Sequence, residues 1–411
     1  MASEYQRVKY ACAATNISMA VVSNLPPVLF LTFRSLYGIS YSLLGLLIFI
    51  NFFTQLTVDL IFSFFSHKIN ISKAVKITPV LTFLGLVMYA LCPMLFPGHI
   101  YMGLVLATVI FSSSGGFVEV LISPVIAAIP SDNPDREMSK LHSFYAWGVV
   151  AVITISTLYI LAFGGQNWQW LVLGLTVIPL VGIILFAGAK IPELQTPEKL
   201  SGTFDYLKNG ALWLCVGAIF FGGAAECSMS QWCSGYLEQA LGIPKVWGDI
   251  FGVALFSVML GLGRTLYSKY GKDITRVLFW GSIGASICYL AAAVSPFPIV
   301  GLLACALTGF CTSMLWPGCL IVASDKFPAA GVFIYALMAS GGDFGASVAP
   351  QLIGIITDRV MALPLAAEVA SGLGITAEQL GMKAGLLTGM FFPLVAVPLM
   401  AYIRKAFYKT S

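Results

Sequence analysis

Residues 99–129 read HIYMGLVLATVIFSSSGGFVEVLISPVIAAI, a nearly unbroken apolar run that contains one carboxylate, Glu119. An α-helix rises 1.5 Å per residue, so a run of this length crosses the bilayer core of about 30 Å. An ionised carboxylate at that depth costs about 2.5 to 3.5 kcal/mol on insertion scales. The stretch therefore predicts a transmembrane helix whose one carboxylate is a candidate functional group.

The composition extends this prediction to the whole chain. Hydrophobic residues make up 58% of it, charged residues 10%, and the mean hydropathy is +0.90, which indicates a polytopic membrane protein. The net charge of +4 comes from basic residues scattered between apolar runs, so we expect no nucleic-acid partner. The nine cysteines show no metal-ligand spacing, and we expect neither a bound metal nor a disulfide framework.

Twelve apolar runs, each bounded by charged residues or by Gly, Pro or Asn, predict twelve transmembrane helices. They lie at 10–33, 42–66, 75–93, 99–129, 141–163, 169–189, 209–238, 247–268, 275–294, 298–323, 330–357 and 382–404. If both termini are cytoplasmic, the outer loops keep only four of the 22 basic residues, namely Arg34, Lys245, Arg359 and Lys383. The positive-inside rule thus predicts a multi-pass protein of the cytoplasmic membrane with both termini inside.

An internal repeat divides the chain. Six residues of the first half recur 193 residues later, namely Gly116, Phe117, Pro124, Ser131, Asp132 and Gly148, matched by Gly309, Phe310, Pro317, Ser324, Asp325 and Gly341. A polar stretch at 191–208 separates the halves and reads as a cytoplasmic linker. We therefore expect an all-α membrane protein with two pseudo-symmetric six-helix bundles, at 1–190 and 209–411.

This arrangement resembles the major facilitator superfamily. Gly-Phe-Val-Glu-Val at 116–120 and Gly-Gly-Ala-Ala-Glu-Cys-Ser-Met-Ser-Gln-Trp at 222–232 resemble its fucose-permease-like group of sugar transporters. The family's Asp-Arg loop signature after the second helix is degenerate here, since 63–70 keeps only the basic pair His67-Lys68. The gating salt bridge that membership would imply at that loop is therefore in doubt.

The resemblance implies that Glu119 couples transport to protons, because the family places a coupling carboxylate on this helix. A buried carboxyl group favours its neutral form, which suits a proton carrier. The family's second carboxylate, on the first helix, is missing, since that helix offers only Asn16 and Asn24. Asp59 is the next candidate for coupling, and with nearby amide oxygens it could alternatively hold Na⁺. A purely structural role is the competing interpretation of both carboxylates.

Polar and aromatic stripes on several predicted helices suggest a solute site. Sugars bind to planar hydrogen-bonding groups and to an aromatic ring, and both occur on 209–238. The candidate pocket residues are Asn51, Gln55, Glu226, Gln231, Trp232 and Trp316. Arg264 and Asp343 are opposite charges in apolar surroundings, so we expect them to form a structural or gating ion pair.

The sequence lacks the fingerprints of common enzyme active sites, so we do not expect an enzyme. It predicts a secondary active transporter that moves a small polar solute, a sugar, through the bilayer by alternating access and proton symport. No cofactor is expected beyond the proton or sodium gradient, and we expect a monomer. The alternatives are a proton-coupled exporter of drugs or amphipathic metabolites and a Na⁺-coupled carrier.

Overall fold

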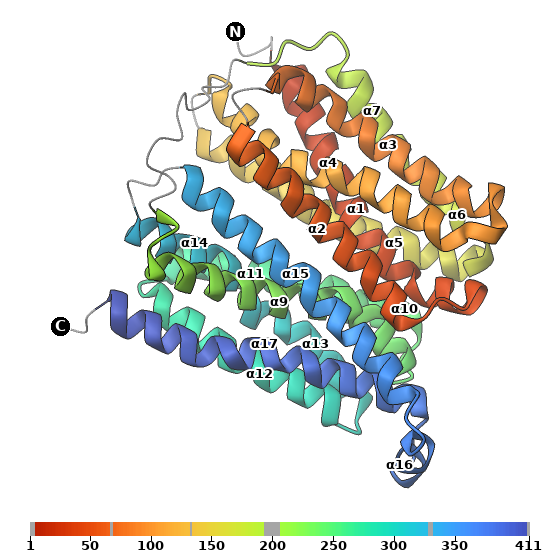
Figure 1. The fold of residues 1–411 in the computed structure, drawn as a ribbon. Coiled ribbons are helices and arrows are strands. Elements are labelled where there is room, and N and C mark those ends of the chain that lie inside the picture. Colours follow the sequence, from red (N-terminus) through yellow and green to blue (C-terminus); the bar gives the residue numbers. More distant parts are fainter. Residues whose placement is uncertain (1–4, 66–68, 132–133, 193–205, 328–331, 409–411) are drawn as a thin grey trace. The chain divides into compact units, whose positions relative to one another are not determined.

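The computed structural model describes residues 5–65, 69–131, 134–192, 206–327 and 332–408 (Figure 1). Within these ranges the regular structure is entirely helical. The first half contains α1 (Gln6–Tyr37), α2 (Tyr41–Phe65), α3 (Ile71–Leu95), α4 (Ile100–Ala128), α5 (Pro134–Phe163), α6 (Trp168–Leu175) and α7 (Val177–Phe186). The second half contains α9 (Gly210–Gln239), α10 (Lys245–Gly248), the π-helix η4 (Asp249–Ala254), α11 (Leu255–Tyr270), α12 (Ile274–Val294), α13 (Pro298–Thr312), α14 (Leu315–Lys326), α15 (Val332–Met361), α16 (Ala366–Gly372) and α17 (Ala377–Phe407).

The helices confirm the expected all-α membrane fold. Eleven helical segments among the described residues are long and apolar enough to cross a membrane. The twelfth expected span, 330–357, corresponds to α15, whose 30 residues are also long enough to cross. Two spans contain breaks that periodicity did not predict, at Thr176 between α6 and α7 and at Ser313 between α13 and α14. The short helix α16 was not predicted either.

The chain forms two compact units whose boundaries differ from the predicted ones. Unit 1 comprises Met1–Thr32 and Phe53–Leu200, and unit 2 comprises Phe33–Phe52 and Ser201–Ser411. The end of α1 and the first half of α2 therefore group with the second half of the sequence. Most of the predicted linker at 191–208 lies outside the described residues, as does the loop with His67 and Lys68.

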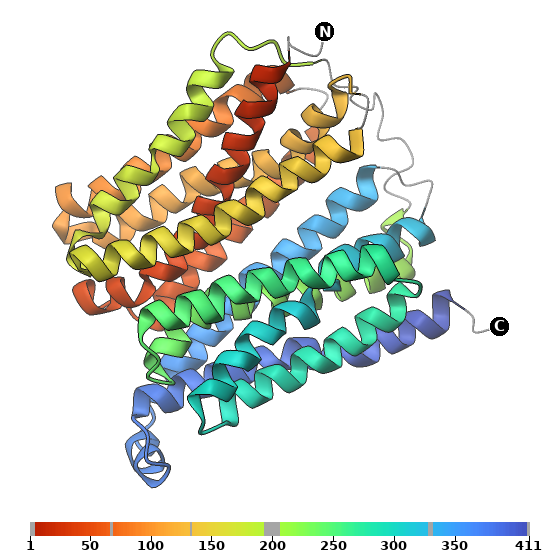
Figure 2. The same ribbon diagram turned by 180° about the vertical axis from the view of Figure 1, so that it is seen from behind.

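In unit 1, α1 packs against α5 (Figure 2). The side-chain amide of Asn16 donates a hydrogen bond of 2.7 Å to the backbone oxygen of Leu141. A Cβ added to Gly148 would lie 3.0 Å from the Cβ of Ala20, so glycine permits this close approach. Asn16 thus has a structural role in the contact between α1 and α5.

An ion pair of 3.1 Å joins Lys9 of α1 to Glu137 of α5. The hydrogen bond from Lys9, reinforced by the charges of Lys9 and Lys140, lowers the pKa of Glu137 from 4.5. A carboxyl group with a lowered pKa stabilises the fold above its unfolded-state pKa, and the contribution is lost as the pH falls through the folded-state value.

We therefore expect Glu137→Gln to reduce the free energy of unfolding at neutral pH by less than about 1 kcal/mol. The difference from the wild type should shrink as the pH falls below about 4.5 and vanish in stronger acid. Thermal unfolding followed across pH measures this, with the exposed Glu368 as the site of a control substitution to Gln. A loss of unfolding free energy in Glu137→Gln that persists unchanged in acid would contradict this expectation.

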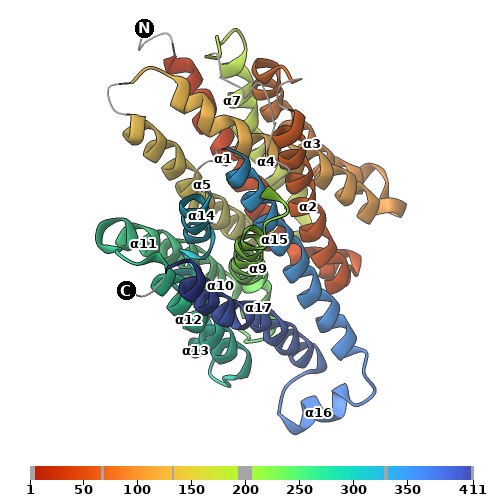
Figure 3. The same cartoon turned by 60° about the vertical axis from the view of Figure 1, so that its left-hand side comes forward.

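In unit 2, α9, α15 and α17 pack side by side, and α12 packs on α17 (Figures 1 and 3). One end of this unit is held together by Glu378 at the start of α17. Its carboxylate accepts hydrogen bonds from Arg34 at 2.7 Å, from the Tyr41 hydroxyl at 2.9 Å and from Gln239 at 2.7 Å. Asp358 of α15 accepts hydrogen bonds from the backbone N–H groups of Tyr41 and Ser42 and so caps α2. These contacts explain why Phe33–Phe52 belongs to unit 2.

Candidate functional site

Two adjacent glycines bring α4 against α2 in unit 1. A Cβ on Gly115 would lie 2.9 Å from the side-chain Cδ of Gln55, and one on Gly116 would lie 2.7 Å from the Cβ of Val58. Both positions therefore need a residue without a side chain. Asp59 follows Val58, and Glu119 lies one helical turn after Gly116, so the same approach places the two acidic residues together.

We expect Gly116→Ala to destabilise the protein by about 1 to 3 kcal/mol, because the new methyl group meets the Val58 side chain and the backbone of Gln55. Thermal unfolding measures this loss. Gly174 in α6 is a matched control, since nothing lies within 4 Å of a Cβ added there. Alanine at position 174 should leave the unfolding temperature unchanged or raise it. Equal effects at both positions would show that the α2–α4 contact is not tight.

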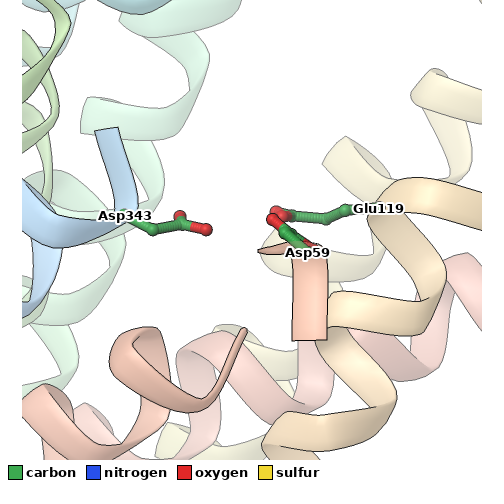
Figure 4. Close-up of side chains that lie close together, drawn as sticks. All are labelled: Asp59, Glu119 and Asp343. Carbon is green, nitrogen blue, oxygen red and sulfur yellow. The ribbon is translucent and has the colours of Figure 1, made fainter. Parts of the chain in front are cut away.

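The carboxylates of Asp59 and Glu119 form a pair within unit 1 (Figure 4). Each has an oxygen within 4.8 Å of an oxygen of the other. The side chain of Asp59 is 1% exposed, whereas Glu119 is exposed. Of the two carboxylates, Asp59 is therefore the more enclosed.

This pair is suited to hold one proton. Two carboxylates this close repel each other when both are ionised, and a proton held between them removes the repulsion. Exposed Glu119 can exchange a proton with water, and enclosed Asp59 makes the doubly charged state costly. Oxygen atoms at this spacing also suit a hard cation such as Na⁺.

The polar residues of α1 and α2 are mostly engaged in helix packing. Asn24 donates a hydrogen bond to the backbone oxygen of Ala20, one turn earlier on its own helix. Gln55 is buried with its side chain against Gly115. Asn51 is also buried and belongs to unit 2. The structure thus gives Gln55 a packing role, and a role for Asn51 in solute binding stays a prediction.

In unit 2, Arg264 pairs with a different carboxylate from the one we expected. Its guanidinium Nη2 lies 3.4 Å from Oε1 of Glu226, and its Nε donates a hydrogen bond of 3.0 Å to the backbone oxygen of Ser313. The prediction that Arg264 pairs with Asp343 is therefore wrong, because its partner is Glu226. Glu226, predicted as a solute ligand, is at the same time the counter-ion of Arg264.

Trp232 is not the open aromatic surface that the sequence suggested. It is 3% exposed, its indole N–H donates a hydrogen bond of 2.9 Å to the backbone oxygen of Pro350, and its ring packs on Tyr41. Neighbouring Gln231 is buried as well.

Trp316 is half-buried, and its ring covers Gly223 of α9 and Gly342 of α15. Gly223 lies one helical turn before Glu226, so Trp316 is the aromatic candidate beside the charged pair. Among the predicted aromatic ligands, its position is the one that suits a solute.

The sequence did not predict that the backbone oxygen of Ser313 holds the Arg264 side chain. Pro317 has no backbone N–H and so cannot bond to the oxygen four residues earlier, which is that of Ser313. Arg264 supplies the missing donor. A proline in the tenth span was a usable signal for this free acceptor, but the helix that supplies the donor is visible only in the structure.

The fold and these sites define a polytopic helical membrane protein with acidic and basic side chains held within its spans. This class includes the transporters of the inner and plasma membranes. The chain belongs to the Major Facilitator Superfamily, whose model matches residues 11–350. It is a transporter of this superfamily by that membership.

Solved structures with the same fold include three transporters. A bacterial homolog of the human lysosomal transporter Spinster, inward-facing and occupied, has a TM-score of 0.71 and 13% identity over 99% of this chain and 98% of that chain. The fucose:proton symporter FucP of E. coli has a TM-score of 0.61 and 14% identity over 97% and 99%. The xylose transporter XylE from E. coli has a TM-score of 0.67 and 13% identity over 94% and 95%. Among curated proteins the chain has no significant match.

Proposed function

We propose that the protein is a proton symporter that imports a small polar solute, a sugar, across the cytoplasmic membrane. The observation that carries this proposal is the pair of carboxylates Asp59 and Glu119, one enclosed and one exposed, within reach of each other. Proton symporters of fucose are among the solved structures with this fold, which supports the same mechanism.

Transport would follow alternating access between the two halves that the internal repeat implies. A proton taken up by Glu119 lowers the charge of the pair from −2 to −1 and permits the loaded carrier to reorient, since moving two uncompensated charges at bilayer depth is costly. Release of the proton on the other side resets the carrier. The energy source is the proton gradient, both termini are cytoplasmic, and the working unit is a monomer.

Glu226, Arg264 and Trp316 are the proposed solute contacts. The charged pair offers an acceptor and a donor for neighbouring hydroxyl groups, and the Trp316 ring offers an apolar face for the C–H side of a sugar. This assignment replaces Trp232, which is enclosed, by Trp316, which is half-buried.

A ligand screen tests this function. Purified protein is heated with sugars, organic acids and cationic drugs at several pH values, with and without Na⁺, and a bound ligand raises the unfolding temperature. The proposal expects stabilisation by at least one sugar and no dependence on Na⁺. Stabilisation by cationic drugs alone would contradict the solute class, and stabilisation that requires Na⁺ would replace the proton by sodium.

A further inference from the structure

Arg264 lies on an exposed stripe of small and polar residues along α11. Gly261, Arg264 and Ser268 follow one another at helical spacing and are all exposed. The exposed leucines of the same helix, Leu262 and Leu266, lie on a separate face. A small, polar stripe at membrane depth indicates a water-accessible path, whereas a leucine face suits lipid. The 44% exposed side chain of Arg264 therefore faces the polar path.

The orientation of this guanidinium is fixed from one side. A Cβ added to Gly263 would collide with the Ser313 side chain, so glycine allows α11 to approach the break between α13 and α14. At that break the Ser313 oxygen, freed by Pro317, accepts the Nε hydrogen of Arg264. Since Nε is anchored, the two Nη groups form the edge that is presented to a ligand.

Glu226 contacts only one of the two Nη groups of Arg264. Its Oε1 lies 3.4 Å from Nη2, at the long end of hydrogen-bond distances. Its Oε2 is enclosed and has no hydrogen-bond partner among the described residues. Arg264 makes one further bond there, to Ser313, and Nη1 has no partner in the described part of the chain. An arginine at this depth with such loose contacts is costly unless something else completes its bonding.

We propose that Arg264 binds the carboxylate of the transported solute and that Glu226 is the internal counter-ion which holds the site when it is empty. The solute class is an acidic sugar. Planar guanidinium binds a carboxylate through two parallel hydrogen bonds, which a neutral hydroxyl group cannot match. Trp316 of α14, whose ring covers Gly223 one helical turn before Glu226 on α9, receives the ring of the same solute.

This inference rests on the proposed function and narrows its solute class. Because Glu226 and an acidic solute compete for Arg264, removal of the Glu226 charge should have opposite effects on the binding of neutral and acidic sugars. A neutral sugar uses Glu226 as an acceptor, so loss of that negative charge weakens its binding. An acidic sugar competes with Glu226 for the guanidinium, so the same loss strengthens its binding.

The experiment measures binding of D-glucuronate and D-glucose to the purified full-length protein by calorimetry. The wild type should bind glucuronate about ten-fold more tightly than glucose. Glu226→Gln should improve glucuronate binding about ten-fold and weaken glucose binding. Arg264→Gln should abolish the preference for glucuronate, and Ser268→Ala, on the same exposed stripe, should change neither affinity.

If Arg264→Gln fails to fold, Arg264→Lys replaces it, and it should lose most of the preference because an ammonium lacks the fork geometry. Glucuronate binding that weakens in Glu226→Gln would overturn the proposal. Binding of glucose without glucuronate also overturns it but leaves sugar transport standing. If the protein binds neither glucose nor glucuronate but binds a different class of solute, the proposed function itself is contradicted.

Discussion

Glu119→Gln is expected to abolish accumulation of solute driven by a pH gradient. Glutamine keeps the size of the side chain but cannot carry a transferable proton, so solute movement no longer depends on the proton gradient. In proteoliposomes the ratio of internal to external solute should fall to about one, the value of passive equilibration. Exchange of labelled for unlabelled solute should survive, because it needs no net proton movement.

The exchange assay separates a lost coupling step from a damaged protein. Glu137→Gln is the matched control, since it changes the same residue type at the end of α5 that lies outside the membrane span, and it should retain accumulation. Accumulation by Glu119→Gln at the wild-type level would remove Glu119 from the coupling mechanism. Loss of exchange together with accumulation would assign Glu119 to solute binding.

Arg264→Gln is expected to destabilise the protein strongly. It leaves Glu226 without a counter-ion and the Ser313 oxygen without a donor, at a cost of about 2 to 3 kcal/mol. This value lies below the range of about 3 to 5 kcal/mol for fully buried pairs because Arg264 is 44% exposed. Thermal unfolding of the purified variant measures the loss.

The double variant Arg264→Gln with Glu226→Gln shows the origin of that loss. Removing both charges eliminates the unpaired carboxylate, so the double variant should be more stable than Arg264→Gln alone. Additive losses from the two substitutions would show that the pair makes no net contribution.

Most of the architecture is predictable from the sequence because hydropathy determines it directly. Apolar runs between polar turns locate twelve helices, and the long run at 99–129 corresponds to α4 with its flanking turn. Glu119 stands out for the same reason, as a carboxylate in an apolar run. Gly115 and Gly116 signal a close helix contact, though the sequence does not say which helix approaches.

The wrong predictions concern which helix faces contact each other. Arg264 and Asp343 are a plausible pair on charge alone, but the carboxylate that reaches Arg264 is Glu226. Trp232 and Trp316 are both aromatic residues within predicted spans, and only the contacts with Tyr41 and Pro350 reveal that Trp232 is enclosed. These outcomes depend on helix rotation and packing, which periodicity leaves open.

The grouping of Phe33–Phe52 with the second half could not be predicted for a related reason. It follows from long-range hydrogen bonds of Glu378 and Asp358 to Arg34, Tyr41 and Ser42. Each of these residues is an ordinary polar residue at a helix end. No local pattern shows whether such a residue binds a partner more than 300 residues away in the chain or a nearby water molecule.

Proton movement that accompanies solute movement tests the central claim most directly. Proteoliposomes that contain the protein and an internal pH-sensitive dye receive a solute identified by the ligand screen, with no pH gradient imposed and with charge movement compensated by an ionophore. We predict that the lumen acidifies as the solute enters, and that Glu119→Gln admits the solute without acidification. Solute entry with no change in internal pH in the wild type would contradict proton symport.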